Sequence, residues 1–224
     1  MDVKKTLLVT GGTSGIGNAT VHLFIAKGWN VVTCGRDTGA IAKLQSEFGD
    51  DKFLGLTADI RLENHVSNIL EETRMRFGLI DVCVLNAGTL GPAPLLPVLE
   101  TDMMELRRTY ETNVFANFNL MKKMVGILRS PGLIVHMTSD AAVQPYPGWG
   151  AYGSSKAAMR QLVEILREES RGTGLSAINF DPGDVDTRMH ALAVPDADRN
   201  ALRKTSDVAL ELYASILKEL GGNQ

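Results

Sequence analysis

The chain has 224 residues, of which 44% are hydrophobic and 22% are charged, and its formal net charge is −3. This length suits one well-buried domain, and the composition is ordinary for a globular protein. The weak negative charge, with no long basic run, argues against binding to nucleic acid or to an anionic membrane.

The two cysteines, Cys34 and Cys83, fall in strand-like apolar runs, so buried reduced thiols and a reducing compartment are expected. No apolar run approaches the length of a membrane span, and no signal-type apolar region precedes the first predicted strand. The histidines show no metal-ligand spacing with cysteines or carboxylates, so no metal site is expected. We therefore expect a cytoplasmic protein that forms one domain over residues 1–224.

Apolar runs with β-branched residues alternate with helical patterns along the chain. Strands are predicted at 6–10, 31–34, 52–57, 79–85, 133–137 and 175–180. Helices are predicted at 19–27, 38–48, 62–77, 102–128, 151–171 and 206–220. Such an alternation predicts an α/β fold, a doubly wound parallel sheet with helices on both faces. Sheets of this kind bind ligands at the carboxyl ends of their strands.

The first strand runs directly into a glycine-rich turn, Gly11-Gly12-Thr13-Ser14-Gly15-Ile16-Gly17, and then into a helix. Because glycines let the backbone approach a ligand and a helix N-terminus favours an anion, this turn predicts a nucleotide phosphate site. A purely structural turn of similar composition is the alternative.

The second strand ends at Gly35-Arg36-Asp37. Arg36 lies where an NAD-binding protein would carry a ribose-binding carboxylate, and it predicts paired hydrogen bonds to a 2′-phosphate. The expected cofactor is therefore NADP(H), with NAD(H) possible, and the alternative is a solvated Arg36. Asp37 either caps the next helix or binds a ribose, and Asp59, after the third strand, either contacts an adenine or caps a helix.

The fourth strand ends at Asn86-Ala87-Gly88, a small turn that lets the backbone lie close to a ligand. In the helix that follows, Asn113 is expected to face inward among apolar neighbours that include Phe115 and Phe118. Its amide is either satisfied within the core or linked to Lys156 through a water.

The fifth strand delivers Ser139 to a loop, and the next helix carries Tyr152 and Lys156 in its first two turns. Their spacing of four residues puts both on one helix face, where the lysine ammonium favours the phenolate form of the tyrosine. A surface pair is the alternative. The ligand-type turns at the same sheet edge argue for a catalytic pair, with the Ser139 hydroxyl available to a substrate oxygen.

In order and spacing, these motifs resemble those of the short-chain dehydrogenase/reductase family over residues 6–187. The motifs are Thr10-Gly11-x-x-x-Gly15-Ile16-Gly17, Asn86-Ala87-Gly88, Asn113, Ser139, Tyr152-x-x-x-Lys156 and Pro182-Gly183-x-Val185-x-Thr187. Residues 144–149 are similar to the branch that contains sepiapterin reductase and benzil reductase. The resemblance implies a Rossmann-like, NAD(P)-binding domain of about six strands in the order 3-2-1-4-5-6.

The resemblance also implies a catalytic set of Asn113, Ser139, Tyr152 and Lys156. Tyr152 would be the general acid/base, and Ser139 would hold the substrate carbonyl. Asn113 would anchor a water in a proton relay. Lys156 would bind the nicotinamide ribose and lower the pKa of Tyr152.

The implied cofactor site extends over the turns at the sheet edge. Thr187 and the Val185 backbone would hold the carboxamide, and Asp59 would contact the adenine. The full implied set is Gly11, Thr13, Ser14, Gly15, Ile16, Gly17, Arg36, Asp59, Ile60, Asn86, Ala87, Gly88, Tyr152, Lys156, Pro182, Gly183, Val185 and Thr187.

The sequence also departs from the family pattern. Ser14 lies where the glycine turn would carry a second basic NADP determinant, and Leu85 replaces the asparagine that often opens the Asn-Asn-Ala-Gly motif. The usual seventh strand, which helps to form a tetramer interface, is missing or very short. We therefore expect a homodimer through the helices near 103–129 and 151–171, or a monomer.

Candidates for a substrate pocket are Leu90, Tyr146, Trp149, Met189, His190, Leu192 and Val194. They suit an apolar or aromatic ketone or dicarbonyl, and simple packing is the alternative for each. The leading hypothesis is reversible, NADPH-dependent reduction of a carbonyl to a secondary alcohol. The rivals are an NAD-dependent secondary-alcohol dehydrogenase, against which Arg36 argues, and a non-catalytic NADP(H)-binding redox sensor, against which the catalytic set argues.

Overall fold

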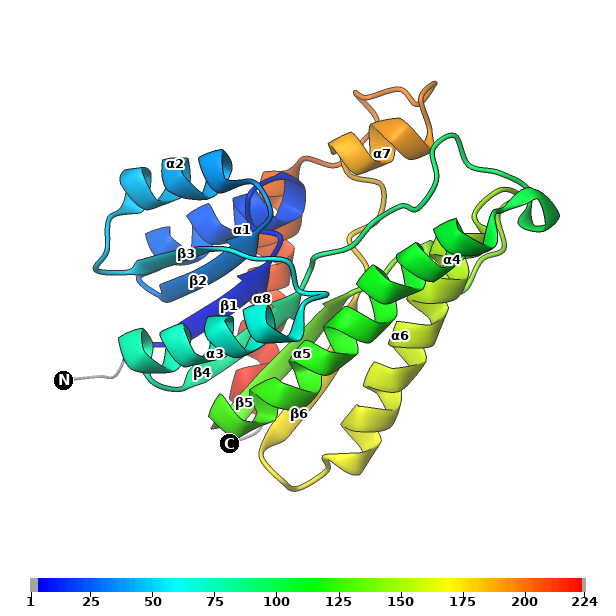
Figure 1. The fold of residues 1–224 in the computed structure, drawn as a ribbon. Coiled ribbons are helices and arrows are strands. Elements are labelled where there is room, and N and C mark those ends of the chain that lie inside the picture. Colours follow the sequence, from blue (N-terminus) through cyan, green and yellow to red (C-terminus); the bar gives the residue numbers. More distant parts are fainter. Residues whose placement is uncertain (1–3, 223–224) are drawn as a thin grey trace.

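The computed structural model describes residues 4–222 (Figure 1). Its strands are β1 (Thr6–Thr10), β2 (Asn30–Gly35), β3 (Phe53–Thr57), β4 (Ile80–Leu85), β5 (Leu128–Met137) and β6 (Leu175–Phe180). They form one parallel sheet in the order β3-β2-β1-β4-β5-β6, which confirms the predicted fold class and strand order. The two ends of the predicted domain, residues 1–3 and 223–224, lie outside the described residues.

Helices cover both faces of the sheet (Figure 1). One face carries α1 (Gly15–Ala26), α2 (Thr38–Phe48) and α8 (Thr205–Gly222), and the other carries α3 (Glu63–Phe77), α5 (Asn117–Met124) and α6 (Gly150–Glu169). Alternate strand residues point to opposite faces, so Leu7 and Val9 of β1 pack with α1 and α8, whereas Leu8 packs with α3, α5 and α6. The sheet is therefore buried on both faces, and a ligand can reach it only at the ends of the strands.

The stretch predicted as one helix at 102–128 is divided by a π-helical segment. It consists of α4 (Met103–Tyr110), the π-helical η2 (Glu111–Ala116), α5 and a 3-10 turn, η3 (Val125–Ile127). The predicted end of this helix is wrong, because Leu128 already pairs with Ile80 as the first residue of β5.

In the π-helical segment the backbone hydrogen bonds change register, and the side chain of Asn117 donates to two of the carbonyl oxygens there. The amide nitrogen of Asn117 donates to the carbonyl oxygens of Thr112 and Asn113, at 3.0 and 3.3 Å. It also donates to the carbonyl oxygen of Ala87 at 3.1 Å, which ties this helix to the turn after β4. Segments of this kind occur frequently at functional sites.

Three short elements complete the loops: η1 (Val98–Glu100), η4 (Asp140–Ala142) and α7 (Arg188–Ala193). The sequence pattern does not predict α7, because six residues are too few to show a helical period. The hydroxyl of Thr187 caps it by accepting from the backbone N–H of His190 at 3.2 Å. In Figure 1, α7 lies above the strand ends and closes one side of that edge.

Candidate active site

A cavity of about 370 Å³ opens at the carboxyl ends of the strands, and the turns after all six strands contribute to its walls, together with α7. Most of the residues predicted to bind a cofactor line it: Gly11, Thr13, Ser14, Gly15, Ile16, Arg36, Asp59, Ile60, Asn86, Ala87, Gly88, Pro182, Gly183, Val185 and Thr187. The predicted catalytic residues Ser139, Tyr152 and Lys156 line the same cavity. The fold thus brings the predicted phosphate site and the predicted proton donor into one space.

A few predicted residues lie outside the cavity lining. Four of the predicted substrate residues line the cavity: Leu90, Trp149, Met189 and His190. The lining does not include the predicted cofactor residue Gly17, the predicted catalytic residue Asn113 or the predicted substrate residues Tyr146, Leu192 and Val194. Gly17 lies behind the glycine turn, and Asn113 is enclosed in the protein interior. Tyr146, Leu192 and Val194 are exposed at the surface.

In the glycine turn, the backbone at Gly17 packs directly against the backbone at Gly11. A Cβ on Gly17 would lie 2.4 Å from the carbonyl oxygen of Gly11, so no larger residue fits there without a shift of the chain. Ser14, the N-cap of α1, makes no side-chain cap hydrogen bond, and the first turn of α1 has no acidic residue. Among the described residues, the N-terminal N–H groups of α1 therefore lack a side-chain partner. This arrangement fits the pyrophosphate of a dinucleotide.

Hydrogen bonds and contacts hold three strand ends together around this turn. Asn86 donates through Nδ2 to the carbonyl oxygen of Thr10 at 2.8 Å, and the Thr10 hydroxyl accepts from the backbone N–H groups of Asn86 and Ala87. A Cβ on Gly15 would lie 3.4 Å from the Thr187 methyl group, so the segment after β6 contacts the glycine turn. The first, fourth and sixth strand ends consequently form one continuous wall.

Arg36 lies at the far end of the cavity, beside the glycine turn. A Cβ on Gly35 would lie 2.9 Å from the Thr13 side chain, so the end of β2 lies directly against the turn. Arg36 is exposed and forms no ion pair within residues 4–222. Asp37 caps α2 by accepting from the N–H of Ala40 at 3.0 Å, which confirms the first of its two predicted roles.

Asp59 is held by an arginine that the sequence interpretation did not consider. Arg61 donates through Nε to both carboxylate oxygens of Asp59, at 3.0 and 3.1 Å. These hydrogen bonds hold the pKa of Asp59 below its ordinary value, and the charge of Arg36 adds to the effect. The alternative that Asp59 caps α3 is wrong, because the N-cap is Leu62. The adenine contact stays a prediction.

Tyr152 and Lys156 lie in the first turns of α6, and both are buried. The Lys156 Nζ lies 5.7 Å from the centroid of the Tyr152 ring and donates to the carbonyl oxygen of Met137 at 2.6 Å. Burial raises the pKa of Tyr152 to about 12; a hydrogen bond with Ser139 opposes this shift, and the carboxylate of Asp181 adds to it. The lost solvation of the phenolate outweighs the hydrogen bond. The lowering of this pKa by Lys156 together with a bound cofactor ring stays a prediction.

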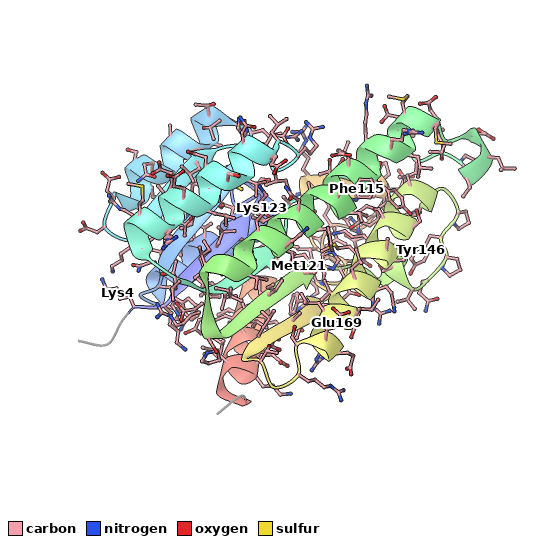
Figure 2. The ribbon with its side chains drawn as sticks, turned by 60° about the horizontal axis from the view of Figure 1, so that its bottom comes forward. Lys4, Phe115, Met121, Lys123, Tyr146 and Glu169 are labelled. Carbon is pink, nitrogen blue, oxygen red and sulfur yellow. The ribbon has the colours of Figure 1, made fainter. Side chains whose placement is uncertain are left out.

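Ser139 is bound to its neighbour Asp140. Its Oγ donates to Oδ1 of Asp140 at 3.0 Å and accepts from the N–H of Ala141 at 3.2 Å. Tyr146, on the loop before α6 (Figure 2), donates its hydroxyl to Oδ2 of the same carboxylate at 2.7 Å. A substrate carbonyl must therefore compete with Asp140 for the Ser139 proton.

The Asn113 side chain is satisfied within the core, as one of the predicted alternatives has it, and its link to Lys156 through a water stays a prediction. Its Nδ2 donates to the carbonyl oxygen of Thr89 and to the Ser155 hydroxyl, both at 2.9 Å, and its Oδ1 accepts from the Thr89 N–H at 2.8 Å. The sequence predicts that Phe115 and Phe118 lie around Asn113, and this prediction is wrong. Their side chains are 57% and 41% exposed. The Asn113 side of this helix packs toward α6, which leaves the two phenylalanines on the outer side.

A comparison with protein families shows where this arrangement belongs. The model of the short chain dehydrogenase family matches residues 5–198. The chain belongs to the short-chain dehydrogenase family. The predicted family is therefore confirmed, and the dehydrogenase is an NAD(P)-dependent oxidoreductase.

Several relatives of the dehydrogenase are similar along most of its length. It is 33% identical to a benzil reductase ((S)-benzoin forming) of Saccharomyces cerevisiae over 192 residues, which cover 83% of this chain and 73% of the relative. It is 34% identical to a serine 3-dehydrogenase of Agrobacterium fabrum over 186 residues, or 82% and 73% of the two chains. A 3-ketoacyl-(acyl-carrier-protein) reductase of Brucella melitensis, solved in complex with NADH, superposes with a TM-score of 0.87 at 22% identity, covering 98% and 93% of the chains. At that identity the likeness shows the fold alone.

Sequence reasoning missed several residues of the dehydrogenase site. Additional charged or polar residues line the cavity: Arg61, Thr112, Asp140, Asp184 and Arg188. Arg61 and Asp140 had a usable signal, since each is a charged residue within two positions of a predicted ligand residue. Asn117 and Ser155 had none, because the contacts that tie them to the site, Asn117 with Ala87 and Ser155 with Asn113, join segments that are far apart in the sequence. Within residues 4–222, no three His, Cys, Asp or Glu side chains form a group suited to a metal ion.

Burial of Lys156 predicts a pH-dependent stability of the dehydrogenase. Burial lowers the pKa of Lys156 from 10.5 to about 8 in the folded state. Between these two pKa values the unfolded chain binds more protons than the folded chain, so the free energy of unfolding rises with pH, by about 3 kcal/mol in total. Below about pH 8 the full cost of burying the charged lysine lowers the free energy of unfolding. Denaturant unfolding without cofactor, at pH 7 to 9.5, should show this rise in the parent relative to Lys156→Met. A stability difference between the two proteins that does not change with pH would contradict it.

Proposed function

We propose that the dehydrogenase reduces a ketone or dicarbonyl to a secondary alcohol with NADPH, in a reversible reaction. The observation that supports this best is the buried Tyr152 phenol, which shares one cavity with Ser139, Lys156 and the glycine turn. When bound, the reduced nicotinamide supplies a hydride to the carbonyl carbon. Tyr152 donates its proton to the carbonyl oxygen, Ser139 holds that oxygen, and Lys156 binds the nicotinamide ribose.

The protonation state of Tyr152 suits its proposed role as proton donor. Its pKa of about 12 keeps the phenol protonated at neutral pH, which is the form that a proton donor needs. Oxidation of an alcohol requires the phenolate as base, and burial disfavours that charged form. The same residues carry both directions, since the group that donates the proton in reduction accepts it in oxidation.

The preference for NADPH over NADH rests on the end of β2. The Arg36 guanidinium is exposed on the cavity wall, free to form paired hydrogen bonds with a 2′-phosphate. The neighbouring carboxylate, Asp37, is engaged in capping α2 and is therefore a poor ligand for the ribose hydroxyls that NAD presents. Both observations favour NADP(H).

The substrate end of the cavity supports an apolar or aromatic carbonyl compound. Leu90, Trp149 and Met189 line it near Tyr152, and Ala193 of α7 adds a further apolar wall. The Trp149 ring lies 5.7 Å from the Tyr152 ring, centroid to centroid. A flat substrate that stacks on Trp149 would bring its carbonyl oxygen toward the Tyr152 hydroxyl.

A parallel substrate screen tests the proposed function. NADPH and NADH consumption should be followed over aliphatic ketones, aromatic ketones and aromatic dicarbonyls, with secondary alcohols and both oxidised cofactors as the reverse arm. We expect turnover with NADPH and the aromatic carbonyls. Turnover confined to alcohols with NAD⁺ would favour the NAD-dependent dehydrogenase, and NADPH binding with no turnover would favour the redox sensor.

The assembly that we propose is a homodimer through the helices near 103–129 and 151–171. Apolar side chains are exposed along α4, η2, α5, η3 and α6: Met104, Phe115, Phe118, Val125 and Ile165. Figure 2 shows Phe115 on this outer surface. We expect Phe115→Asp to halve the molar mass measured by light scattering, because it buries a charge at the interface. The control is Met75→Asp, an exposed apolar residue on α3, outside the proposed interface. Loss of the dimer in that variant, or a monomeric parent, would contradict the proposal.

The cytoplasmic location and the single domain over residues 1–224 stay predictions. Cys34 and Cys83 are free and buried, in keeping with a reducing compartment. No helix within residues 4–222 combines the length and the apolar character that a bilayer span requires.

A further inference from the structure

The catalytic turn of α6 contains another polar side chain, Ser155, which is fully buried. Its Oγ donates to the carbonyl oxygen of Tyr152 at 2.7 Å and accepts from Nδ2 of Asn113 at 2.9 Å. Ser155 directly precedes Lys156 in the sequence, yet it does not line the cavity. Its hydroxyl therefore touches neither substrate nor cofactor and acts on other residues of the protein.

Asn113 continues this contact to the turn after β4. Its amide exchanges hydrogen bonds with both the N–H and the carbonyl oxygen of Thr89, next to Gly88. A Cβ on Gly88 would lie 3.2 Å from Oδ1 of Asn113 and 3.7 Å from Nζ of Lys156. The Gly88 backbone, the Asn113 amide and the Lys156 ammonium thus meet at one place. Gly88 and Lys156 both line the cavity, so the β4 turn and the catalytic helix meet at its wall here.

We propose that Ser155 is a positioning residue, which links Asn113 in η2 to α6 and so holds Tyr152 and Lys156 at a set distance from the β4 turn. This inference rests on the proposed reductase function. Without the hydroxyl, one N–H of Asn113 loses its acceptor in a buried place, and the two helices must readjust to satisfy it. Displacements of about an ångström are enough to slow a reaction that depends on aligned groups.

Kinetics of three Ser155 variants test this role. Ser155→Ala should lower kcat about tenfold with little change in the KM for NADPH, because the groups that bind the cofactor remain. Ser155→Thr keeps the hydroxyl and should restore most of kcat. The matched control is Ser154→Ala, an exposed neighbour whose hydroxyl donates to the carbonyl oxygen of Gly150 at 2.6 Å, and it should behave as the parent. If Ser155→Ala does not fold, Ser155→Cys tests the same hydrogen bond with a side chain of similar size and a weak acceptor.

Two further measurements separate positioning from a purely structural role. In Ser155→Ala, the apparent pKa that governs kcat should shift, because Tyr152 and Lys156 move together relative to the β4 turn and so change their surroundings in the cavity. In a double-mutant cycle, Ser155→Ala should add little to the loss of kcat in Asn113→Ala, since both remove the same link. Losses that multiply, or a parental kcat and pH profile in Ser155→Ala, would overturn the proposal.

Comparing Ser155→Ala with Tyr152→Phe distinguishes a failure of the proposed Ser155 role from a failure of the proposed reductase function. An inactive Tyr152→Phe variant together with a fully active Ser155→Ala variant would refute the role of Ser155 and leave the reductase function standing. A fully active Tyr152→Phe variant would refute the proposed function itself.

Discussion

The Tyr152→Phe variant should lose carbonyl reduction by a factor of about 10² to 10⁴ in kcat, the range that a positioned proton donor contributes. The change removes only the hydroxyl that donates the proton. The ring stays packed against Trp149, and Lys156 keeps its hydrogen bond to Met137. NADPH binding should therefore remain close to that of the parent, which NADPH fluorescence titration can measure beside initial rates.

Tyr146→Phe is the matched control for this prediction. Tyr146 lies six residues before Tyr152, is exposed and does not line the cavity. Its hydroxyl donates a hydrogen bond to Asp140. Removing that hydroxyl should leave kcat near the parental value. A Tyr152→Phe enzyme that turns over at the parental rate, or a Tyr146→Phe enzyme that loses as much, would reassign the proton donor.

The Arg36→Ala variant should weaken NADPH binding about 10- to 100-fold and leave NADH binding nearly unchanged. A hydrogen bond to a charged group contributes about 1.5–3 kcal/mol, and 1.4 kcal/mol corresponds to a factor of ten. NADH lacks the 2′-phosphate, so it loses no such contact. Dissociation constants for both cofactors, measured by fluorescence or calorimetry, check the prediction.

Arg61→Ala is the control for Arg36. Arg61 lines the same end of the cavity, but its guanidinium is engaged by Asp59. We expect it to change the dissociation constants of NADPH and NADH by similar factors. Equal losses of both cofactors in Arg36→Ala would show that Arg36 does not recognise the 2′-phosphate.

The amino-acid sequence by itself determined the fold class and the edge of the sheet at which the site lies. The predicted bounds of β1, α2 and β6 are those observed, because each is a short periodic run ended by glycine, proline or a capping side chain. Parallel strands present their carboxyl ends at one edge, so the turns after them had to meet. The lining by Gly15, Asn86 and Thr187 could therefore be anticipated without a structure.

Other properties depended on the tertiary structure. The link from Thr89 through Asn113 to Ser155 joins three segments that are far apart in the sequence. The π-helical segment is stabilised in part by the contact of Asn117 with Ala87, which is also distant in the sequence. Burial raises the pKa of Tyr152, and this burial could not be predicted from the sequence, because the solvation of a phenol depends on everything packed around it. Secondary structure depends largely on residues that are close in the sequence, so the sequence pattern predicts it. Hydrogen-bond partners and burial are set by segments that meet only after the sheet has formed.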